Sequence, residues 1–261
     1  GDKVPEVVVF DTAFHSTMPE KAFIYPVPYE FYEKYKVRRY GFHGTSHRYV
    51  SSELSKKIGK DIKDLKLITC HIGNGSSITA VKNGKVIDTT MGLTPLDGFM
   101  MGSRSGSLDP SVVTFIMEKE GLSPEEMSNL LNKKSGLLGI SGVSTDDRDV
   151  TAAEKEGNKR AALAHEILYY QIAKYIGSFW VAMGGCDGIV FTAGLGENQP
   201  VLRQKVCEYL ECMGVKVCDE RNNQRGSAFM ISTDNSSIPV WVIATNEELV
   251  IARDTKALVE G

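Results

Sequence analysis

The sequence predicts a mixed α/β domain in which helices cover a β-sheet. Apolar, β-branched segments at residues 67–70 and 188–192 are typical of buried strands. Asn83-Gly84 separates two alternating segments and favours a tight hairpin turn, which indicates two adjacent antiparallel strands. Segments of helical length alternate with these strands, and this alternation is typical of a sheet with helices packed against it.

The amino-terminal part of the sequence is predicted to hold one strand, one loop and one helix. Residues 7–10, Val-Val-Val-Phe, have the unbroken apolar character of a buried strand. Three prolines between residues 17 and 28 indicate a loop that crosses the surface, and residues 46–58 predict a helix. A domain rarely begins directly on a buried strand, so we expect the chain to start inside a domain.

Helices and strands continue to alternate after the hairpin. Ser123-Pro124-Glu125-Glu126 is a capping box that marks a helix start, and Gly157 interrupts a longer helical segment. The expected helices are residues 110–120, 123–133, 150–180, about 200–213 and 247–259. The expected strands are residues 77–82, 85–89, 188–192, 215–217 and 239–243.

Composition excludes several classes of partner. The chain has 261 residues with a formal net charge of -3, and it lacks the basic excess that nucleic acids and anionic membranes attract. Its five cysteines form no CxxC pair, which favours reduced thiols and no structural metal. No signal peptide or apolar run of membrane-spanning length is evident. We therefore expect a cytoplasmic protein with a small-molecule substrate and neither a nucleic-acid nor a membrane partner.

Two glycine-containing segments follow predicted strands, where open α/β sheets commonly bind ligands. Residues 71–77, His-Ile-Gly-Asn-Gly-Ser-Ser, offer amides and hydroxyls to phosphate oxygens, although an ordinary hairpin turn explains them about equally well. Residues 194–198, Gly-Leu-Gly-Glu-Asn, lie at a strand-to-helix turn that would suit an anion or a nucleotide. They lack the Rossmann and Walker A spacings, so a plain turn remains the alternative.

Two further segments carry a candidate cation and a candidate histidine. Arg104, between glycines and hydroxyls at residues 100–106, suits a planar oxyanion, whereas a surface arginine paired with Asp97 or Asp109 is the alternative. His43 lies in a glycine-flanked loop at residues 40–47, with Thr45 or Ser46 available to cap the next helix. His43 and His47 lack an intervening glutamate and are not expected to bind a metal, and His15 and His165 are taken as structural.

Along the chain the four segments follow the order 40–47, 71–77, 100–106 and 194–198. Residues 10–15 precede them and residues 244–248 follow them. Together, these segments resemble the acetate kinase family. The resemblance covers essentially all 261 residues, including residues 144–149. It implies an α/β, ribonuclease-H-like fold of the sugar kinase, Hsp70 and actin superfamily, in which two domains close over ATP. It also implies Mg²⁺-dependent transfer of the ATP γ-phosphoryl group to acetate or another short-chain carboxylate, giving ADP, in a homodimer.

The resemblance also implies a role for individual residues. Asp11 is implied as the active-site aspartate, with His43 and Arg104 stabilising the phosphoryl group in transit. Pro95 is implied to border the methyl group of acetate, and Glu247 to help bind magnesium. The nucleotide residues implied are His71, Ile72, Gly73, Asn74 and Gly75 at the phosphates, and Asp146, Asp147, Arg148, Gly194, Leu195, Gly196, Glu197 and Asn198 at the adenosine. Because acetate is already ionised near neutral pH, we expect Asp11 to position magnesium-bound water or Arg104 without removing a proton.

The sequence departs from the family pattern in two places. Family chains carry an upstream strand and phosphate-binding hairpin that nothing here matches, so we expect the carboxyl-terminal two-thirds of a family chain. Residues 1–12 would be the last strand of a mostly missing amino-terminal domain, 13–246 the nucleotide-binding and dimerisation domain, and 247–261 a closing helix. Asp147 stands where an apolar or another residue is common, which we expect to alter the adenosine side only slightly. A noncatalytic nucleotide-binding and dimerisation fragment, and a propionate or other short-chain acyl kinase, remain alternatives.

Overall fold

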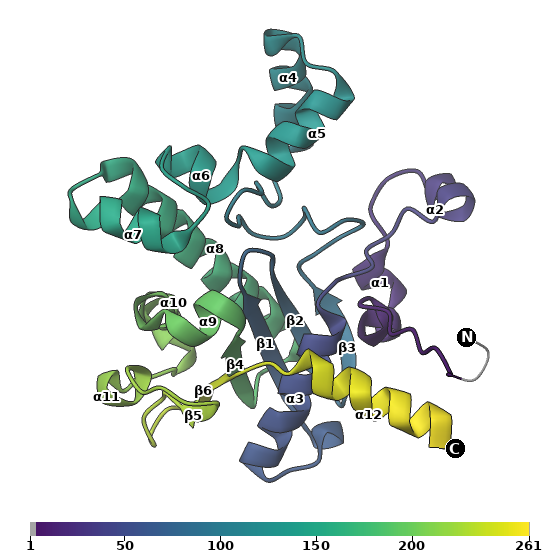
Figure 1. Cartoon of the computed structure of the whole chain (residues 1–261), viewed down its shortest axis with the longest axis vertical. Helices are drawn as coiled ribbons and strands as arrows, with labels where there is room; N and C mark the ends of the chain where they lie inside the picture. Colours follow the sequence, from purple (N-terminus) through teal and green to yellow (C-terminus); the bar gives the residue numbers. More distant parts are fainter. Residues whose placement is uncertain (1–3, 261) are drawn as a thin grey trace.

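A six-stranded mixed sheet forms the centre of the structure, a computed structural model that describes residues 4–260. The strand order is β3-β2-β1-β4-β6-β5 (Figure 1). Strands β1, β4 and β6 are parallel to one another, and the remaining neighbours are antiparallel. The strands are β1 (Lys66–Ile72), β2 (Ser76–Lys82), β3 (Lys85–Thr89), β4 (Gly188–Thr192), β5 (Ala228–Met230) and β6 (Val240–Ile243).

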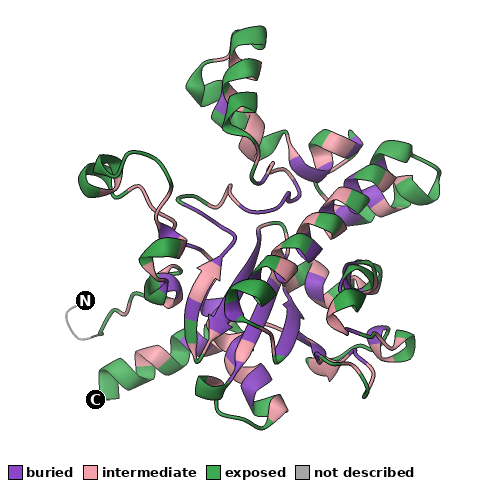
Figure 2. Ribbon diagram, turned by 180° about the vertical axis from the view of Figure 1, so that it is seen from behind, coloured by how far each residue is buried: buried purple, intermediate pink, exposed green. Residues whose placement is uncertain are grey.

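Helices cover both faces of this sheet. Helix α3 (Gly44–Ile58) packs on β1, β4 and β6, and α12 (Glu247–Glu260) lies against α3 (Figure 1). Helix α8 (Lys159–Met183) crosses the opposite face, in front of the sheet in Figure 2. The other helices are η1 (Ala13–Thr17), α1 (Glu20–Phe23), α2 (Glu30–Tyr35), η2 (Ile62–Asp64), α4 (Pro110–Glu120), α5 (Pro124–Lys133), α6 (Gly136–Ser141), α7 (Asp147–Lys155), α9 (Ala193–Asn198), α10 (Pro200–Tyr209), η3 (Glu211–Met213) and α11 (Asp219–Asn222).

The two central strands are buried on both faces, which explains their continuous apolar sequences. Along β1, Leu67 packs into the core beneath α3, whereas Ile68 and Cys70 pack into the larger core beneath α8. Every residue of β4 is buried, and Figure 2 shows the central strands in the colour of buried residues. Helices on both sides therefore remove the sheet from water and leave its strand ends as the accessible edge.

Several predicted elements are confirmed. Asn83 and Gly84 both have positive φ, 56° and 75°, as a type I′ hairpin turn requires. The Ser123 side chain accepts a hydrogen bond from the Glu126 amide while the Glu126 carboxylate accepts one from the Ser123 amide, so the capping box forms. Helices α7 and α8 are separated at residues 156–158, next to the predicted break at Gly157.

Four expectations about local structure are wrong. Residues 7–10 are not a buried strand, because no described strand pairs with them, and Val8 and Phe10 are 72% and 68% exposed. The proline-containing segment 17–28 is not all loop, since it holds α1. Residues 215–217 contribute only an isolated bridge from Val217 to Ser232, and residues 194–198 form α9 instead of an open turn.

The expected closing segment 247–261 is helical as far as it is described. Asp254 of α12 pairs with Arg48 of α3, and this pair holds α12 across the first face of the sheet. Residue 261 and residues 1–3 lie outside the described residues, so the expected boundaries at 1–12 and 247–261 remain predictions.

Candidate active site

The turn between β1 and β2 is the point on which the candidate catalytic side chains converge. The Ser76 hydroxyl closes the turn, accepting from the Gly73 amide at 3.1 Å and donating to the Gly73 carbonyl at 2.8 Å. A Cβ placed on Gly75 would lie 3.3 Å from Arg104 Nη1 and 3.3 Å from His43 Nε2. Glycine therefore keeps the backbone of this turn within reach of two side chains that can donate hydrogen bonds.

Arg104 reaches the turn without a carboxylate partner among the described residues. Its Nη1 donates to the Pro95 carbonyl at 3.3 Å, which fixes the guanidinium at one edge. The expected alternative partners are wrong, because Asp97 pairs with Arg39 at 3.2 Å and Asp109 caps α4. The charge of Arg104 is therefore available to an oxyanion.

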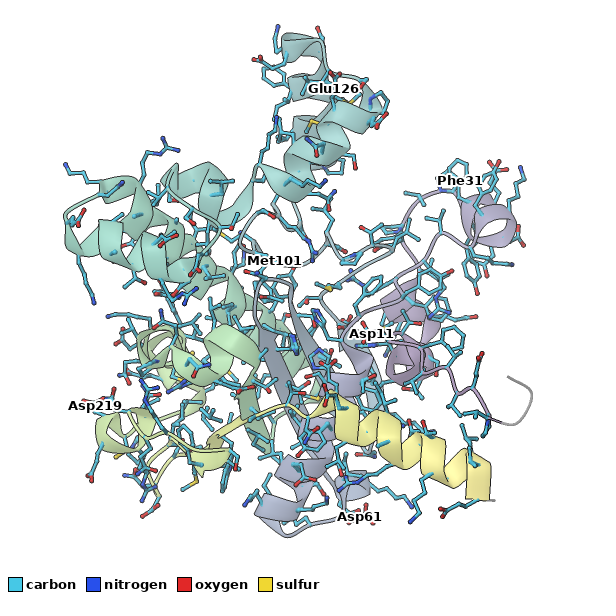
Figure 3. All side chains as sticks on the ribbon, viewed as in Figure 1. Asp11, Phe31, Asp61, Met101, Glu126 and Asp219 are labelled. Atoms are coloured by element: carbon cyan, nitrogen blue, oxygen red, sulfur yellow. The ribbon has the colours of Figure 1, made fainter. Side chains whose placement is uncertain are left out.

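Asp11 fixes the backbone of His43. Asp11 Oδ2 accepts from the His43 amide at 2.7 Å, and His43 has a left-handed φ of 58° just before α3. The next residue, Gly44, has to be a glycine, because a Cβ at this position would lie 2.3 Å from the Asp11 carbonyl oxygen. The expected helix cap at Thr45 or Ser46 is wrong, since both residues lie buried inside the first turn of α3. In Figure 3, Asp11 lies between α1 and the start of α12.

Four histidines, His15, His43, His47 and His71, form a cluster behind the turn, called here the histidine cluster, in which His15 and His47 are buried and the other two are half-buried. The rings of His43 and His71 stack with centroids 4.1 Å apart. The Ser77 hydroxyl lies 2.9 Å from His43 Nδ1 and 2.7 Å from His47 Nε2, so it bridges the two rings. Burial lowers the pKa of all four, to about 3 for His15 and for His71. The cluster is therefore uncharged at neutral pH.

A cavity of about 760 Å³ opens beside the turn and is large enough for a nucleotide. It lies between the β1–β2 turn, the start of α7 and helix α9, and Asp146 caps α7 by accepting from the Arg148 amide at 2.9 Å. Hydrogen bonds from Arg148 also lower the pKa of Asp146 to about 2. The lining residues are His43, His71, Gly73, Asn74, Gly75, Asp146, Asp147, Arg148, Ala193, Gly194, Leu195, Asn198 and Gln199.

Comparisons with known proteins decide the family. Residues 2–253 match the model of the Acetokinase family. The chain belongs to the acetokinase family. It is 58% identical over 255 residues to acetate kinase of Natranaerobius thermophilus and 58% identical over 260 residues to that of Thermotoga maritima. In each case the match covers 98% of this chain and 64% of the relative. The chain thus spans somewhat less than two thirds of these acetokinase relatives.

Solved structures of the acetokinase family agree with this assignment. The Porphyromonas gingivalis acetate kinase superposes with a TM-score of 0.94 at 51% identity, over 96% of this chain and 63% of that one. A propionate kinase from Francisella tularensis superposes with a TM-score of 0.91 at 44% identity, over 97% of this chain and 64% of that one. The predicted α/β fold class and the family resemblance are both confirmed. Within residues 4–260, no helix is long and apolar enough to cross a membrane.

The structure gathers most of the nucleotide residues implied by the acetokinase resemblance, but three of them do not line the cavity. Ile72 is 1% exposed and packs in the core, and Gly196 packs against β1 and β4. Glu197 turns inward, where its Oε1 accepts from the Ala193 amide at 2.8 Å and the Thr245 amide at 3.2 Å. Glu197 therefore joins α9 to the segment before α12, a supporting role in the cavity wall.

Sequence reasoning missed several residues around the site. Ala193 and Gln199 line the cavity, and Gln199 directly precedes Pro200 at the start of α10. Proline in a first helical turn marks the preceding residue as the helix boundary, so this signal was present in the sequence. The loop before α4 packs on the hairpin, since Met101 and Gly102 line a second, narrow cavity together with Gly73 and Asn74. Figure 3 places Met101 beside the end of the hairpin. No local signal pointed to that contact.

Glu247 begins α12 close to Asp11. Burial raises the pKa of the Glu247 carboxyl, and the nearby negative charge of Asp11 raises it further. Among residues 4–260, no three His, Cys, Asp or Glu side chains are arranged to hold a metal by themselves. Two neighbouring carboxylates nevertheless fit Mg²⁺, which usually keeps several waters and uses one or two carboxylates together with substrate phosphates.

Proposed function

We propose that this chain is the nucleotide-binding part of an acetate kinase, which transfers the γ-phosphoryl group of ATP to acetate and gives acetyl phosphate and ADP. The observation that carries the proposal is the convergence of Arg104 and His43 on Gly75 at the edge of the nucleotide-sized cavity. The family membership and the high identity to acetate kinases support it. ATP would place its phosphates along residues 71–75 and its adenosine against α7 and α9.

Phosphoryl transfer is catalysed mainly by alignment and by neutralisation of charge on the equatorial oxygens. Arg104 supplies that charge through a planar fork of donors, which the Pro95 carbonyl holds at one edge. His43 supplies a second contact, and Asp11 fixes the backbone from which it projects. A carboxylate acceptor needs no proton removed, so Asp11 acts by positioning.

Magnesium would be held by Glu247 together with Asp11. When bound, it would supply charge neutralisation between the phosphates and the acceptor. Glu247 is suited to this task because the negative charge of Asp11 raises the pKa of its carboxyl, and a divalent cation would relieve this repulsion.

The acceptor, the location and the assembly are also part of the proposal. Pro95 would border the methyl group of acetate, and propionate is a second candidate acceptor because a propionate kinase shares this fold. We also propose a homodimer in the cytoplasm, as the family resemblance implies, and the net charge of -3 fits the absence of a nucleic-acid or anionic-membrane partner.

A coupled assay of acetyl phosphate formation tests the proposal. With Mg-ATP and acetate, Arg104→Ala is expected to lower kcat by about 100-fold to 1,000-fold while leaving the Kd for Mg-ADP nearly unchanged, because Arg104 acts on the transferring group. Arg253→Ala, an exposed arginine of α12, is the matched control. Mg-ADP binding without turnover by the unchanged chain would instead support a noncatalytic nucleotide-binding and dimerisation fragment.

A further inference from the structure

A buried carboxylate joins three elements at the nucleoside end of the cavity. Asp147, at the start of α7, is 6% exposed and lines the cavity. Its Oδ1 accepts from His165 Nε2 of α8 at 3.2 Å. Its Oδ2 accepts from the side-chain amide of Gln199, at the junction of α9 and α10. Movement of this carboxylate would therefore alter the cavity wall.

Both ring nitrogens of His165 face carboxylate oxygens. Nε2 faces Asp147, and Nδ1 lies 2.5 Å from Glu154 Oε2. An ionised carboxylate only accepts hydrogen bonds, and a neutral imidazole has only one N–H, so both contacts require the cationic ring. Burial lowers the pKa of His165, but the hydrogen bonds to Asp147 and Glu154 outweigh it, and the net pKa is raised above 6.5.

The surroundings make these two carboxylates the main determinants of the charge on His165. Its ring stacks on Tyr169 with centroids 5.7 Å apart. Lys205 and Glu208 line a neighbouring cavity of about 600 Å³ together with His165. They form an ion pair with each other at 3.0 Å, so their charges largely cancel at His165. Helix α6, which also packs on α8, has no titratable side chain. The other titratable groups facing this region are Glu166 and Tyr169 of α8 and Lys205, Glu208 and Tyr209 of α10.

We propose that His165 is a positioning residue: as a cation it holds the Asp147 carboxylate and the Gln199 amide in the cavity wall, and nucleotide affinity depends on its protonation. This inference rests on the proposed nucleotide site. When His165 loses its proton, one ring nitrogen presents a lone pair to a carboxylate. The contact to Asp147 is the longer one and is lost first. Asp147 then faces the cavity with an uncompensated negative charge, which repels an anionic nucleotide.

From the sequence, Asp147 was expected to alter the adenosine side only slightly, because the sequence shows neither the burial of Asp147 nor its contact with His165. The structure gives Asp147 a partner 18 positions away in the chain, and this partner compensates the charge of a carboxylate that is only 6% exposed.

Calorimetric titration with Mg-ADP between about pH 6 and pH 9 tests the inference in this chain. The affinity is expected to fall about tenfold as the pH rises through the pKa of His165, a typical coupling between two sites. Glu154→Gln removes one of the two carboxylates that favour the cation, so the midpoint of the fall should move to lower pH. His165→Gln should bind weakly at every pH. Glu166→Gln is the matched control and should keep the original profile, because Glu166 is exposed and its side chain makes no hydrogen bond or ion pair with His165 in the described structure.

The outcomes separate this inference from the proposed function. Mg-ADP affinity that is constant across the range, or an unmoved midpoint in Glu154→Gln, overturns the inference and leaves the proposed function standing. Absence of Mg-ADP binding at every pH overturns both. If His165→Gln does not fold by circular dichroism, Glu154→Gln carries the test, because Glu154 is 41% exposed and its loss leaves the core intact. Titration of the His165 ring by NMR should then share its midpoint with the affinity.

Discussion

Lowering the pH from 7 to 5 is expected to destabilise the folded chain strongly, because the histidine cluster is buried without charge. Burial lowers the pKa of His15 and His71 from 6.5 to about 3. Below pH 6.5 the unfolded chain binds protons that the folded chain cannot accept, so stability falls as the pH falls. Each of these two histidines contributes about 2 kcal/mol to the loss between pH 7 and pH 5, roughly 4 kcal/mol together.

Urea unfolding at a series of pH values measures this loss. The matched variant is His15→Phe, which keeps a ring in the core but cannot titrate. His15 is fully buried, and its Nε2 lies 3.2 Å from Thr79 Oγ1 while its Nδ1 has no partner in the described structure. In the variant, the pH-dependent fall in the free energy of unfolding should therefore be smaller by about 2 kcal/mol, apart from any constant cost of the substitution. A pH dependence identical to that of the unchanged chain would contradict a buried neutral His15.

His165 acts in the opposite direction. Its folded pKa is raised above 6.5, so the stability that it contributes is present below pH 6.5 and is lost as the pH rises through the folded pKa. The histidine cluster lowers the free energy of unfolding as the pH falls, whereas loss of the proton from His165 lowers it as the pH rises. Stability is therefore expected to be greatest between these two limits.

The sequence was sufficient to predict those structural features that depend only on neighbouring residues. The Asn83-Gly84 turn and the Ser123 capping box each need only neighbouring residues, and both form as predicted. Residues 7–10 have strand-like composition, but a strand also needs a partner backbone, which composition does not encode. Their apolar side chains instead line a groove with α12 and remain largely exposed.

The candidate site shows the same division between local and long-range information. The motifs around His43, Gly75 and Arg104 were recognised one by one, and their convergence required the fold. The histidine cluster draws on three separate segments, and a single buried histidine is usually structural, so no pattern in the sequence suggested the group. Arg104 was given the wrong alternative partners because charge pairing over several residues depends on loop geometry.

Arg203→Met is expected to lower the free energy of unfolding by about 3–5 kcal/mol, because it leaves several buried acceptors without donors. Arg203 is 1% exposed and lies on α10. Its guanidinium donates to the carbonyls of Gly196 and Glu197 at 2.9 Å each, and to the side chain and carbonyl of Asn222 at 2.8 and 2.6 Å. Burial lowers the pKa of Arg203 to about 10, so it stays charged at neutral pH and holds α9 and α11 together.

The position of α9 links this stability prediction to the site. Because Gly194, Leu195 and Asn198 of α9 line the cavity, releasing the Gly196 and Glu197 carbonyls should also weaken Mg-ADP binding. Urea unfolding gives the stability change, and calorimetry gives the Kd. Lys205→Met on the same helix removes an exposed cation and should change stability by less than about 0.5 kcal/mol. If the free energy of unfolding of Arg203→Met lay within about 1 kcal/mol of that of the unchanged chain, α9 would be held by its contacts with the sheet and by Glu197 alone. The carbonyls of Gly196 and Glu197 would then have to find water, which their burial beneath α10 opposes.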